Sequence, residues 1–88
     1  LEFYNQALTL SQKFASKSEQ AATLNGIGRT FYHLGEYKKA LEYYNQTLIL
    51  YREVNDKQGE ANSLNNIGLI YNFVGDYEKA VEYYNQAL

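Results

Sequence analysis

The sequence predicts an all-α chain of antiparallel helix-turn-helix repeats, a fragment of an α-solenoid. The first observation is an internal repeat: LEYYNQTL at residues 41–48 returns as LEFYNQAL at 1–8 and VEYYNQAL at 81–88. A spacing of about forty residues is typical of solenoid repeats. The second is composition, because the chain has no Pro and is rich in residues that favour helices. The third is periodicity, since no stretch alternates with the period of two that a strand requires.

The first expected helix covers residues 1–15, with Leu1, Tyr4 and Leu8 on one side. We expect it to be the second helix of a preceding repeat whose first helix the sequence does not contain. The chain has no Met and breaks inside a repeat unit at both ends, which predicts a piece of a longer array.

Residues 17–54 are expected to form the first complete repeat. Ser16 and Glu19 have the spacing of a capping box, so a helix should begin at 17 and run to 34, with Gly35 as the left-handed residue after it. Its apolar stripe is Leu24, Ile27, Gly28, Phe31 and Leu34. The second helix is expected over 37–54, and its buried side should carry Tyr37, Ala40, Leu41, Tyr44, Leu48 and Tyr51.

Residues 57–88 are expected to form a second, truncated repeat. Asn55 and Asp56 supply turn and N-cap chemistry before a helix over 57–74. The apolar stripe of that helix matches the first repeat and consists of Leu64, Ile67, Gly68, Tyr71 and Val74. The last helix is expected to begin at 77, after a turn in which Asp76 is a better N-cap residue than its equivalent in the first repeat, Glu36.

Two glycines inside the predicted helices need a compensating contact, because Gly costs about 1 kcal/mol relative to Ala within a helix. These are Gly28 and Gly68, and Ala40 and Ala80 are small residues at a constant offset on the following helices. Each Gly–Ala pair is therefore expected to mark a close antiparallel crossing. Gly59 has no counterpart in the other copy, and we interpret it as a tolerated weak point.

Composition argues against several classes of function. The net charge is −2 with both signs interspersed, which disfavours nucleic acid and membrane surfaces as partners. The chain has no Cys, and we find no signal peptide or membrane-spanning run, so a cytoplasmic location is expected. Its only histidine, His33, has no second His and no Cys nearby, so we predict no metal, no cofactor and no catalytic site.

The repeated positions resemble the tetratricopeptide repeat. The signature of that family consists, in order, of a large residue, Leu-Gly, an aromatic residue, a turn similar to Gly-Asp-Tyr, Ala, a second aromatic residue and a final Ala. The first copy meets it with Leu24, Ile27, Gly28, Phe31, Gly35, Tyr37, Ala40, Tyr44 and Thr47, and the second with Leu64, Ile67, Gly68, Tyr71, Gly75, Tyr77, Ala80, Tyr84 and Ala87. Leu replaces the usual Trp in both copies, and no Pro closes the second helix. The unit exceeds the common length of about 34 residues. This longer form is similar to the repeats of kinesin light chains, Pins-type adaptors and bacterial multi-repeat proteins.

The resemblance implies a right-handed superhelix in which the first helix of each repeat lines a concave groove for an extended peptide or a partner helix. The groove residues expected from it are Asn25, Arg29, Tyr32, His33, Asn62, Asn65, Asn66, Leu69, Asn72 and Phe73. Asn is a poor helix former, and its amide both donates and accepts hydrogen bonds. Asn25 and Asn65 are therefore expected to form a ladder that pairs with a ligand's backbone; the alternative is that they are solvated surface residues.

The sequence also bears on three other functions. Some relatives bind the C-terminal carboxylate of chaperones through Lys, Asn and Arg, but this chain has Asn25 and Asn65 where the Lys would lie. The array can instead be a spacer or self-assembly element that associates end to end or by helix exchange, since Leu1, Tyr4 and Leu88 would otherwise be exposed. An enzyme would require a catalytic domain outside this sequence.

Overall fold

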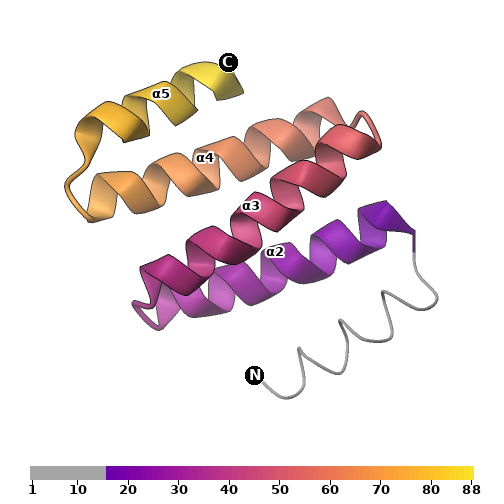
Figure 1. Cartoon of the computed structure of the whole chain (residues 1–88), viewed down its shortest axis with the longest axis horizontal. Helices are drawn as coiled ribbons and strands as arrows, with labels where there is room; N and C mark the ends of the chain where they lie inside the picture. Colours follow the sequence, from indigo (N-terminus) through magenta and orange to yellow (C-terminus); the bar gives the residue numbers. More distant parts are fainter. Residues whose placement is uncertain (1–15) are drawn as a thin grey trace.

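The described part of the chain, residues 16–88 of the computed structural model, consists of four α-helices (Figure 1). They are α2 (Lys17–His33), α3 (Tyr37–Glu53), α4 (Lys57–Phe73) and α5 (Tyr77–Ala87). The predicted all-α fold is confirmed, and the helix expected at 1–15 lies outside the described residues. The helices predicted over 17–34, 37–54 and 57–74 each end one residue earlier, because Leu34, Val54 and Val74 are their C-cap residues.

The three connections between these helices share one turn geometry. Each contains a residue in the left-handed region just after the C-cap: Gly35 at φ 78°, Asn55 at φ 62° and Gly75 at φ 88°. After α2, the N–H of Glu36 donates to the carbonyl of Phe31 at 2.9 Å, and the N–H of Gly35 donates to Tyr32 at 3.0 Å. This is the Schellman pattern, which satisfies the last carbonyls of a helix and turns the chain back.

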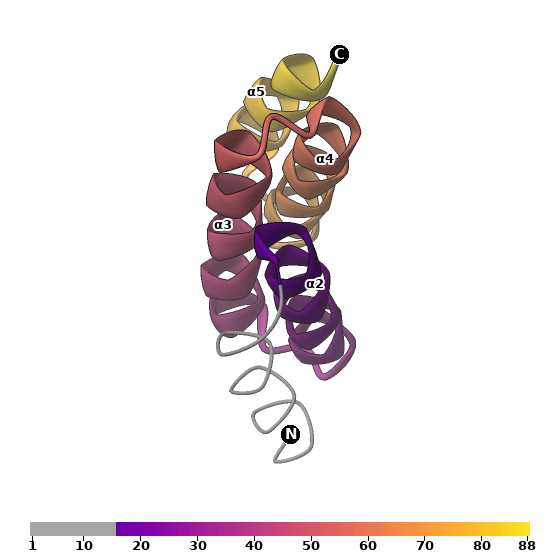
Figure 2. The same cartoon turned by 90° about the vertical axis from the view of Figure 1, so that its right-hand side faces the viewer.

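The helices form two antiparallel hairpins, α2–α3 and α4–α5, and α3 also packs against α4. Figure 2 shows α2 and α4 along one side of the molecule and α3 and α5 along the other. The first helix of each hairpin thus lies in one layer and the second helix in the other.

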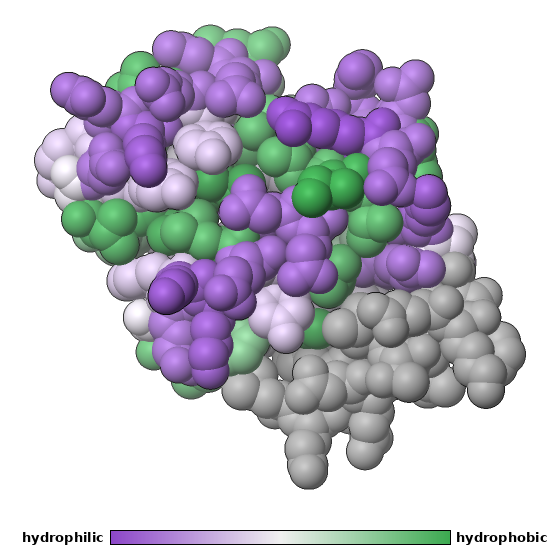
Figure 3. Space-filling model, viewed as in Figure 1, coloured by the Kyte–Doolittle hydropathy of each residue, from purple (hydrophilic) through white to green (hydrophobic). Residues whose placement is uncertain are grey.

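The core runs continuously through both hairpins. It consists of Ile27, Phe31, Ala40, Tyr44, Leu48, Leu64, Ile67 and Ile70. Two stripe residues were predicted wrongly, since Leu34 is 60 % exposed and Val74 is 54 % exposed. Both are C-cap residues whose side chains lie past the last turn. On the side of the molecule seen in Figure 3, hydrophilic side chains cover the helices and hydrophobic ones gather between them.

Tyrosine rings fill the space beside the helical glycines. A Cβ on Gly28 would lie 2.8 Å from Cε1 of Tyr44, and a Cβ on Gly68 would lie 2.8 Å from Cε1 of Tyr84. The crossings are close, as predicted, but an aromatic ring fills the space of the missing side chain. The interpretation of Gly59 was wrong, because a Cβ there would lie 2.5 Å from Cδ1 of the Tyr51 ring.

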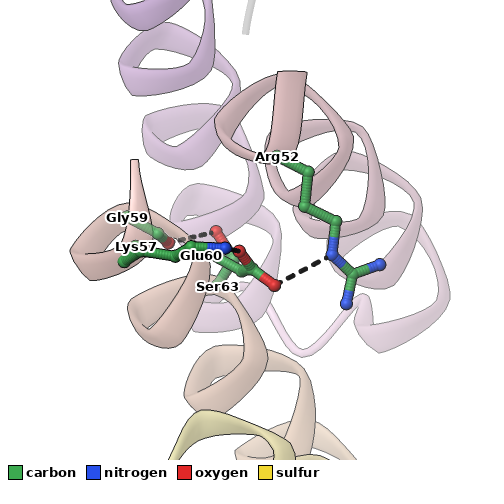
Figure 4. Close-up of polar contacts among 5 residues, drawn as sticks. All are labelled: Arg52, Lys57, Gly59, Glu60 and Ser63. Atoms are coloured by element: carbon green, nitrogen blue, oxygen red, sulfur yellow. Dashed lines mark hydrogen bonds and ion pairs between the residues drawn. The ribbon is translucent and has the colours of Figure 1, made fainter. Parts of the chain in front are cut away.

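Polar contacts fix the junction between the hairpins, where α3 passes into α4 (Figure 4). The Asp56 carboxylate accepts from the N–H of Gly59 at 3.0 Å and caps α4. Arg52 Nε lies 3.1 Å from the Glu60 carboxylate, and the Ser63 hydroxyl donates to the Gly59 carbonyl at 2.9 Å (Figure 4). No helix in residues 16–88 combines the length and apolar character needed to cross a bilayer.

Candidate functional site

The ten predicted groove residues occupy the sides of α2 and α4 that the second-layer helices α3 and α5 leave largely uncovered. We call this surface the α2–α4 face. Seven of its side chains are exposed: Arg29, His33, Asn62, Asn65, Leu69, Asn72 and Phe73. The other three, Asn25, Tyr32 and Asn66, are partly buried. Solvent can therefore reach seven of these side chains freely and the other three in part.

One direct bond joins the two helices across this face. The side-chain amide of Asn66 donates to the side-chain oxygen of Asn25 at 3.2 Å, although the two residues are 41 apart in sequence. The ladder predicted from Asn25 and Asn65 concerns their pairing with a ligand's backbone, and it stays a prediction. Because the Asn25 oxygen already accepts the bond from Asn66, its amide group remains as the part most available to a ligand, whereas the whole Asn65 side chain is exposed.

Aromatic rings form a second contact between the repeats. The Phe73 ring lies edge-on to Tyr32 with centroids 5.8 Å apart, and it stacks on Tyr37 at 6.2 Å. The Tyr32 ring is in turn 5.2 Å from His33. Phe73 nevertheless remains 59 % exposed, so these rings present apolar surface beside the asparagines.

Four other members of the face make no polar contact. Arg29, Asn62, Asn65 and Asn72 make no hydrogen bond or ion pair within the described residues. Leu69 is 37 % exposed. Within residues 16–88 the polar groups of these four side chains therefore have no hydrogen-bond partner.

Charge is distributed unevenly over the molecule. Between residues 20 and 35 the only formally charged side chain is Arg29, and between 61 and 75 there is none. Within residues 16–88 the carboxylates lie in the first turns of the helices, in the turns between helices, and on α3 and α5. The α2–α4 face is therefore rich in amides and aromatic rings and contains no carboxylate, while the whole chain carries a net charge of −2.

Sequence reasoning assigned Tyr44 only to the core, where it is 4 % exposed, and did not anticipate that charges of the face act on its hydroxyl. Burial raises the pKa of the Tyr44 hydroxyl above 10.0, the Arg29 charge opposes this, and Tyr32 adds to it. The hydroxyl therefore lies within electrostatic reach of two members of the face. A Tyr rather than Phe at a core position opposite a Gly is the sequence signal that was available.

Two shallow hollows lie elsewhere, between the helices of each hairpin. One of about 260 Å³ is lined by Gln20, Leu24, Gln46, Ile49 and Leu50. The other, of about 280 Å³, is lined by Lys57, Glu60, Ala61, Leu64, Gln86, Ala87 and Leu88. Neither includes a predicted site residue. In residues 16–88 no three His, Cys, Asp or Glu side chains cluster as a metal site would require.

A family profile described as tetratricopeptide repeat matches residues 1–53 and, in a second overlapping alignment, residues 19–88. A search of curated proteins gave no match. The two alignments together span the whole chain.

Proposed function

The chain belongs to the tetratricopeptide repeat family, whose members generally mediate protein–protein interactions without catalysis, and from this premise we propose that its α2–α4 face binds a peptide segment of a partner protein. The segment is extended or helical and lies along the groove that the first helices of successive repeats line. The protein acts as a preformed docking surface and performs no chemistry on the ligand.

The observation that carries this proposal is the combination of polar and apolar groups on one face. Exposed amides at Asn62, Asn65 and Asn72 can donate to and accept from a peptide backbone. Beside them, Leu69 and Phe73 offer apolar surface for side chains of the ligand. Amides supply sequence-independent contacts, and the apolar pair supplies preference for particular side chains, which is how peptide grooves divide affinity and specificity.

The test uses peptides selected from a displayed random library on the immobilised chain. Truncation of Phe73 to Ala should weaken the selected peptide about tenfold or more, because exposed aromatic residues often act as binding anchors. Asn65→Ala should weaken it by a smaller factor, about threefold to tenfold, through loss of one or two hydrogen bonds. Isothermal titration measures both affinities.

The control is Ile49→Ala, which removes a side chain of comparable exposure, 55 %, from α3 in the other layer. It should leave the affinity unchanged. Failure to select any peptide, or a peptide that is sensitive to Ile49→Ala and not to Phe73→Ala, would contradict the proposed site.

A second function, self-assembly, is favoured by a different surface. Tyr77 and Val81 on α5 are 65 % and 55 % exposed. Their equivalents in the first repeat, Tyr37 and Leu41, are partly buried in the packing of α3 against α4. The α5 surface therefore has the composition of a repeat interface without its covering helix, and exposed patches of this kind promote association.

Replacement of Val81 by Lys tests this second function. Lys places a charge in the centre of the exposed apolar surface, so oligomers that depend on it should dissociate in sedimentation equilibrium. Ile49→Lys is the control, since it adds the same charge to an exposed position on α3. A chain that sediments as a monomer before any substitution would contradict self-assembly and leave peptide binding intact.

A further inference from the structure

Asn25 is the only asparagine of the chain that is followed directly by a glycine, Gly26. An asparagine before glycine is prone to lose its amide group without an enzyme, because the next backbone nitrogen attacks the side-chain carbonyl carbon. A glycine has no Cβ and a freely rotating backbone, so its nitrogen reaches that carbon with little hindrance. In the second repeat the two equivalent positions hold Asn65 and Asn66, so this labile dipeptide belongs to the first repeat alone.

The folded chain holds the two reacting groups apart. Both residues lie in the middle of α2, where each backbone N–H donates to the carbonyl four residues earlier. The Gly26 carbonyl accepts from the Thr30 hydroxyl at 3.0 Å. The partly buried Asn25 side chain is fixed by the bond that its oxygen accepts from Asn66 at 3.2 Å. Attack by the Gly26 nitrogen therefore requires α2 to open around residue 25.

The composition of α2 favours such opening. Gly26 and Gly28 both lie inside this helix, and glycine is the poorest helix former apart from proline. The hydroxyls of Thr23 and Thr30 bond to carbonyls four residues earlier, at 3.1 and 3.0 Å, a contact that slightly destabilises and bends helices. Helicity here consequently depends on packing against α3, and segments of this kind open locally without global unfolding.

We propose that Asn25 is a site of spontaneous deamidation, and that the reaction proceeds whenever α2 opens in water. A base removes the proton of the Gly26 N–H, and the nitrogen forms a bond to Cγ of Asn25. The bond from Cγ to Nδ2 then breaks and releases ammonia, which leaves a cyclic imide. Water opens this imide at one of its two carbonyls. Opening at Cγ gives aspartate, and opening at the backbone carbonyl gives isoaspartate.

The aspartate product retains the bond across the α2–α4 face. Its carboxylate still accepts from the Asn66 amide, and only the donor end of Asn25 is lost. Arg29 lies four residues later and forms no ion pair within residues 16–88. That spacing, with the acid before the base, is the one at which ion pairs stabilise a helix. Deamidation therefore places the first carboxylate on the α2–α4 face.

The isoaspartate product has a different consequence. The chain then continues through the former side chain, which inserts one methylene into the backbone of α2. Helical hydrogen bonds require a constant spacing of backbone groups, so α2 cannot remain continuous through this position. A single reaction at Asn25 thus yields one product that remains folded and carries a new charge, and one product that loses the middle of α2.

The first experiment uses the denatured chain, so that its result does not depend on folding. The unmodified chain and Gly26→Ala are incubated in mildly alkaline buffer with guanidinium, and peptide mass spectrometry locates each exchange of an amide for a carboxylate. Asn25 should react before any other asparagine, with Asn65 as the matched control. Gly26→Ala should slow the reaction at Asn25 about tenfold or more, because the added methyl group hinders the attacking nitrogen. Another asparagine that reacts first, or a Gly26→Ala chain that reacts equally fast, would overturn the proposal.

The second experiment uses the folded chain in the same buffer without guanidinium. Folding should slow deamidation of Asn25 by the same factor by which it slows hydrogen exchange of the Gly26 amide, since both require the same opening. Chromatography should separate an aspartate form from an isoaspartate form of lower helicity. A chain in which Asn25 stays intact although the Gly26 amide exchanges would overturn deamidation of the folded protein through this opening.

Asn25→Asp reproduces the aspartate product and tests the retained bond. It should melt about 4 °C or more above Asn25→Ala, because the carboxylate still accepts from Asn66 whereas alanine offers no acceptor. Equal melting temperatures of the two variants would overturn the retained bond.

Discussion

At the scale of single residues, packing depends on rings that occupy the space next to glycines. The Gly28–Tyr44 and Gly68–Tyr84 contacts lie within hairpins, and the Gly59–Tyr51 contact joins α3 to α4. In each case the ring lies closer to the glycine than any Cβ would allow. A glycine that is unfavourable for an isolated helix is therefore required by its neighbour.

Gly59→Ala should destabilise the chain by about 1–2 kcal/mol, because steric overlap with Tyr51 exceeds the gain of about 1 kcal/mol in helix propensity. The overlap involves Cγ and Cδ1, atoms near the root of the Tyr51 side chain that cannot move away without displacing the ring. Urea denaturation measures the change. Gln58→Ala, at the exposed neighbouring position, should change stability by less than about 0.5 kcal/mol. A Gly59→Ala variant that is more stable than the unmodified chain would refute this account.

The decrease in folding stability at alkaline pH should depend on the hydroxyls of Tyr44 and Tyr51. Burial is the main cause that raises the pKa of each hydroxyl above 10.0. The folded state then retains protons that the unfolded chain loses, so stability is unaffected below pH 10 and decreases as pH rises above it. Tyr44→Phe should make this decrease shallower in denaturation curves collected between about pH 9 and 11. An unchanged slope would show that the folded chain does not hold this proton.

The Gly59 contact shows what the repeat pattern could reveal about individual residues. Gly59 was misread because glycine does not recur at the equivalent position, which is Glu19. Its partner changes as well, since the equivalent of Tyr51 is Ser11. The copy that has Ser in place of the Tyr51 ring has Glu in place of Gly59, so the two positions change together. A comparison that takes one position at a time cannot detect this joint change.

At the scale of helices, the ends were more predictable than the contacts between them. Ser16 accepts from the Glu19 N–H at 3.3 Å, and Gly35, Asn55 and Gly75 adopt the left-handed conformation, because capping and turns depend on neighbouring residues. The Asn25–Asn66 bond depends instead on the angle and spacing between α2 and α4, which local sequence does not specify. The exposed positions of the face were therefore predictable, whereas the pairing within it was not.

Among α2 to α5, only α3 has an N-cap residue whose side chain makes no capping hydrogen bond. Glu36 makes no side-chain cap bond, whereas Asp76, with nearly the same backbone angles, accepts from the Lys79 N–H at 3.3 Å. Glu36→Asp should therefore stabilise the chain by about 0.5–1 kcal/mol, since the shorter carboxylate reaches the free N–H. A thermal scan should show a rise of a few degrees.

The reciprocal substitution is the control for this cap. Asp76→Glu should lower the melting temperature by a similar amount, because it imposes on α5 the geometry observed at α3. The ion pair of Glu36 with Lys39, at 3.8 Å between exposed groups, contributes too little to mask the gain. If Asp76→Glu is neutral, the side-chain cap does not contribute to stability at these turns.

At the scale of the whole molecule, the repeat predicts how the array should respond to extension. Both hairpins have the same internal packing: Phe31 stacks on Tyr43 and Tyr71 stacks on Tyr83, each at 5.5 Å. Stability in such arrays is approximately the sum of the repeats and of the interfaces between neighbours. The α5 surface with Tyr77 and Val81 is an interface of this kind without a neighbour in the described structure.

Residues 49–88 appended directly after Leu88 should complete that interface, because Leu88 is equivalent to Leu48 and the repeat continues in register. A second α4 would then cover Tyr77 and Val81 as the first covers Tyr37 and Leu41. Since both the added repeat and the added interface are favourable, the urea midpoint should rise. The appended copy leaves its own equivalents of Tyr77 and Val81 uncovered on the new last helix, so any association through this surface should persist there while the original Tyr77 and Val81 are covered. Urea denaturation of the extended and original chains measures the rise, and sedimentation of extended chains with Lys in place of either Val81 or its appended copy locates the association. Loss of oligomers on replacement of the covered Val81 alone would contradict covering by the appended helix.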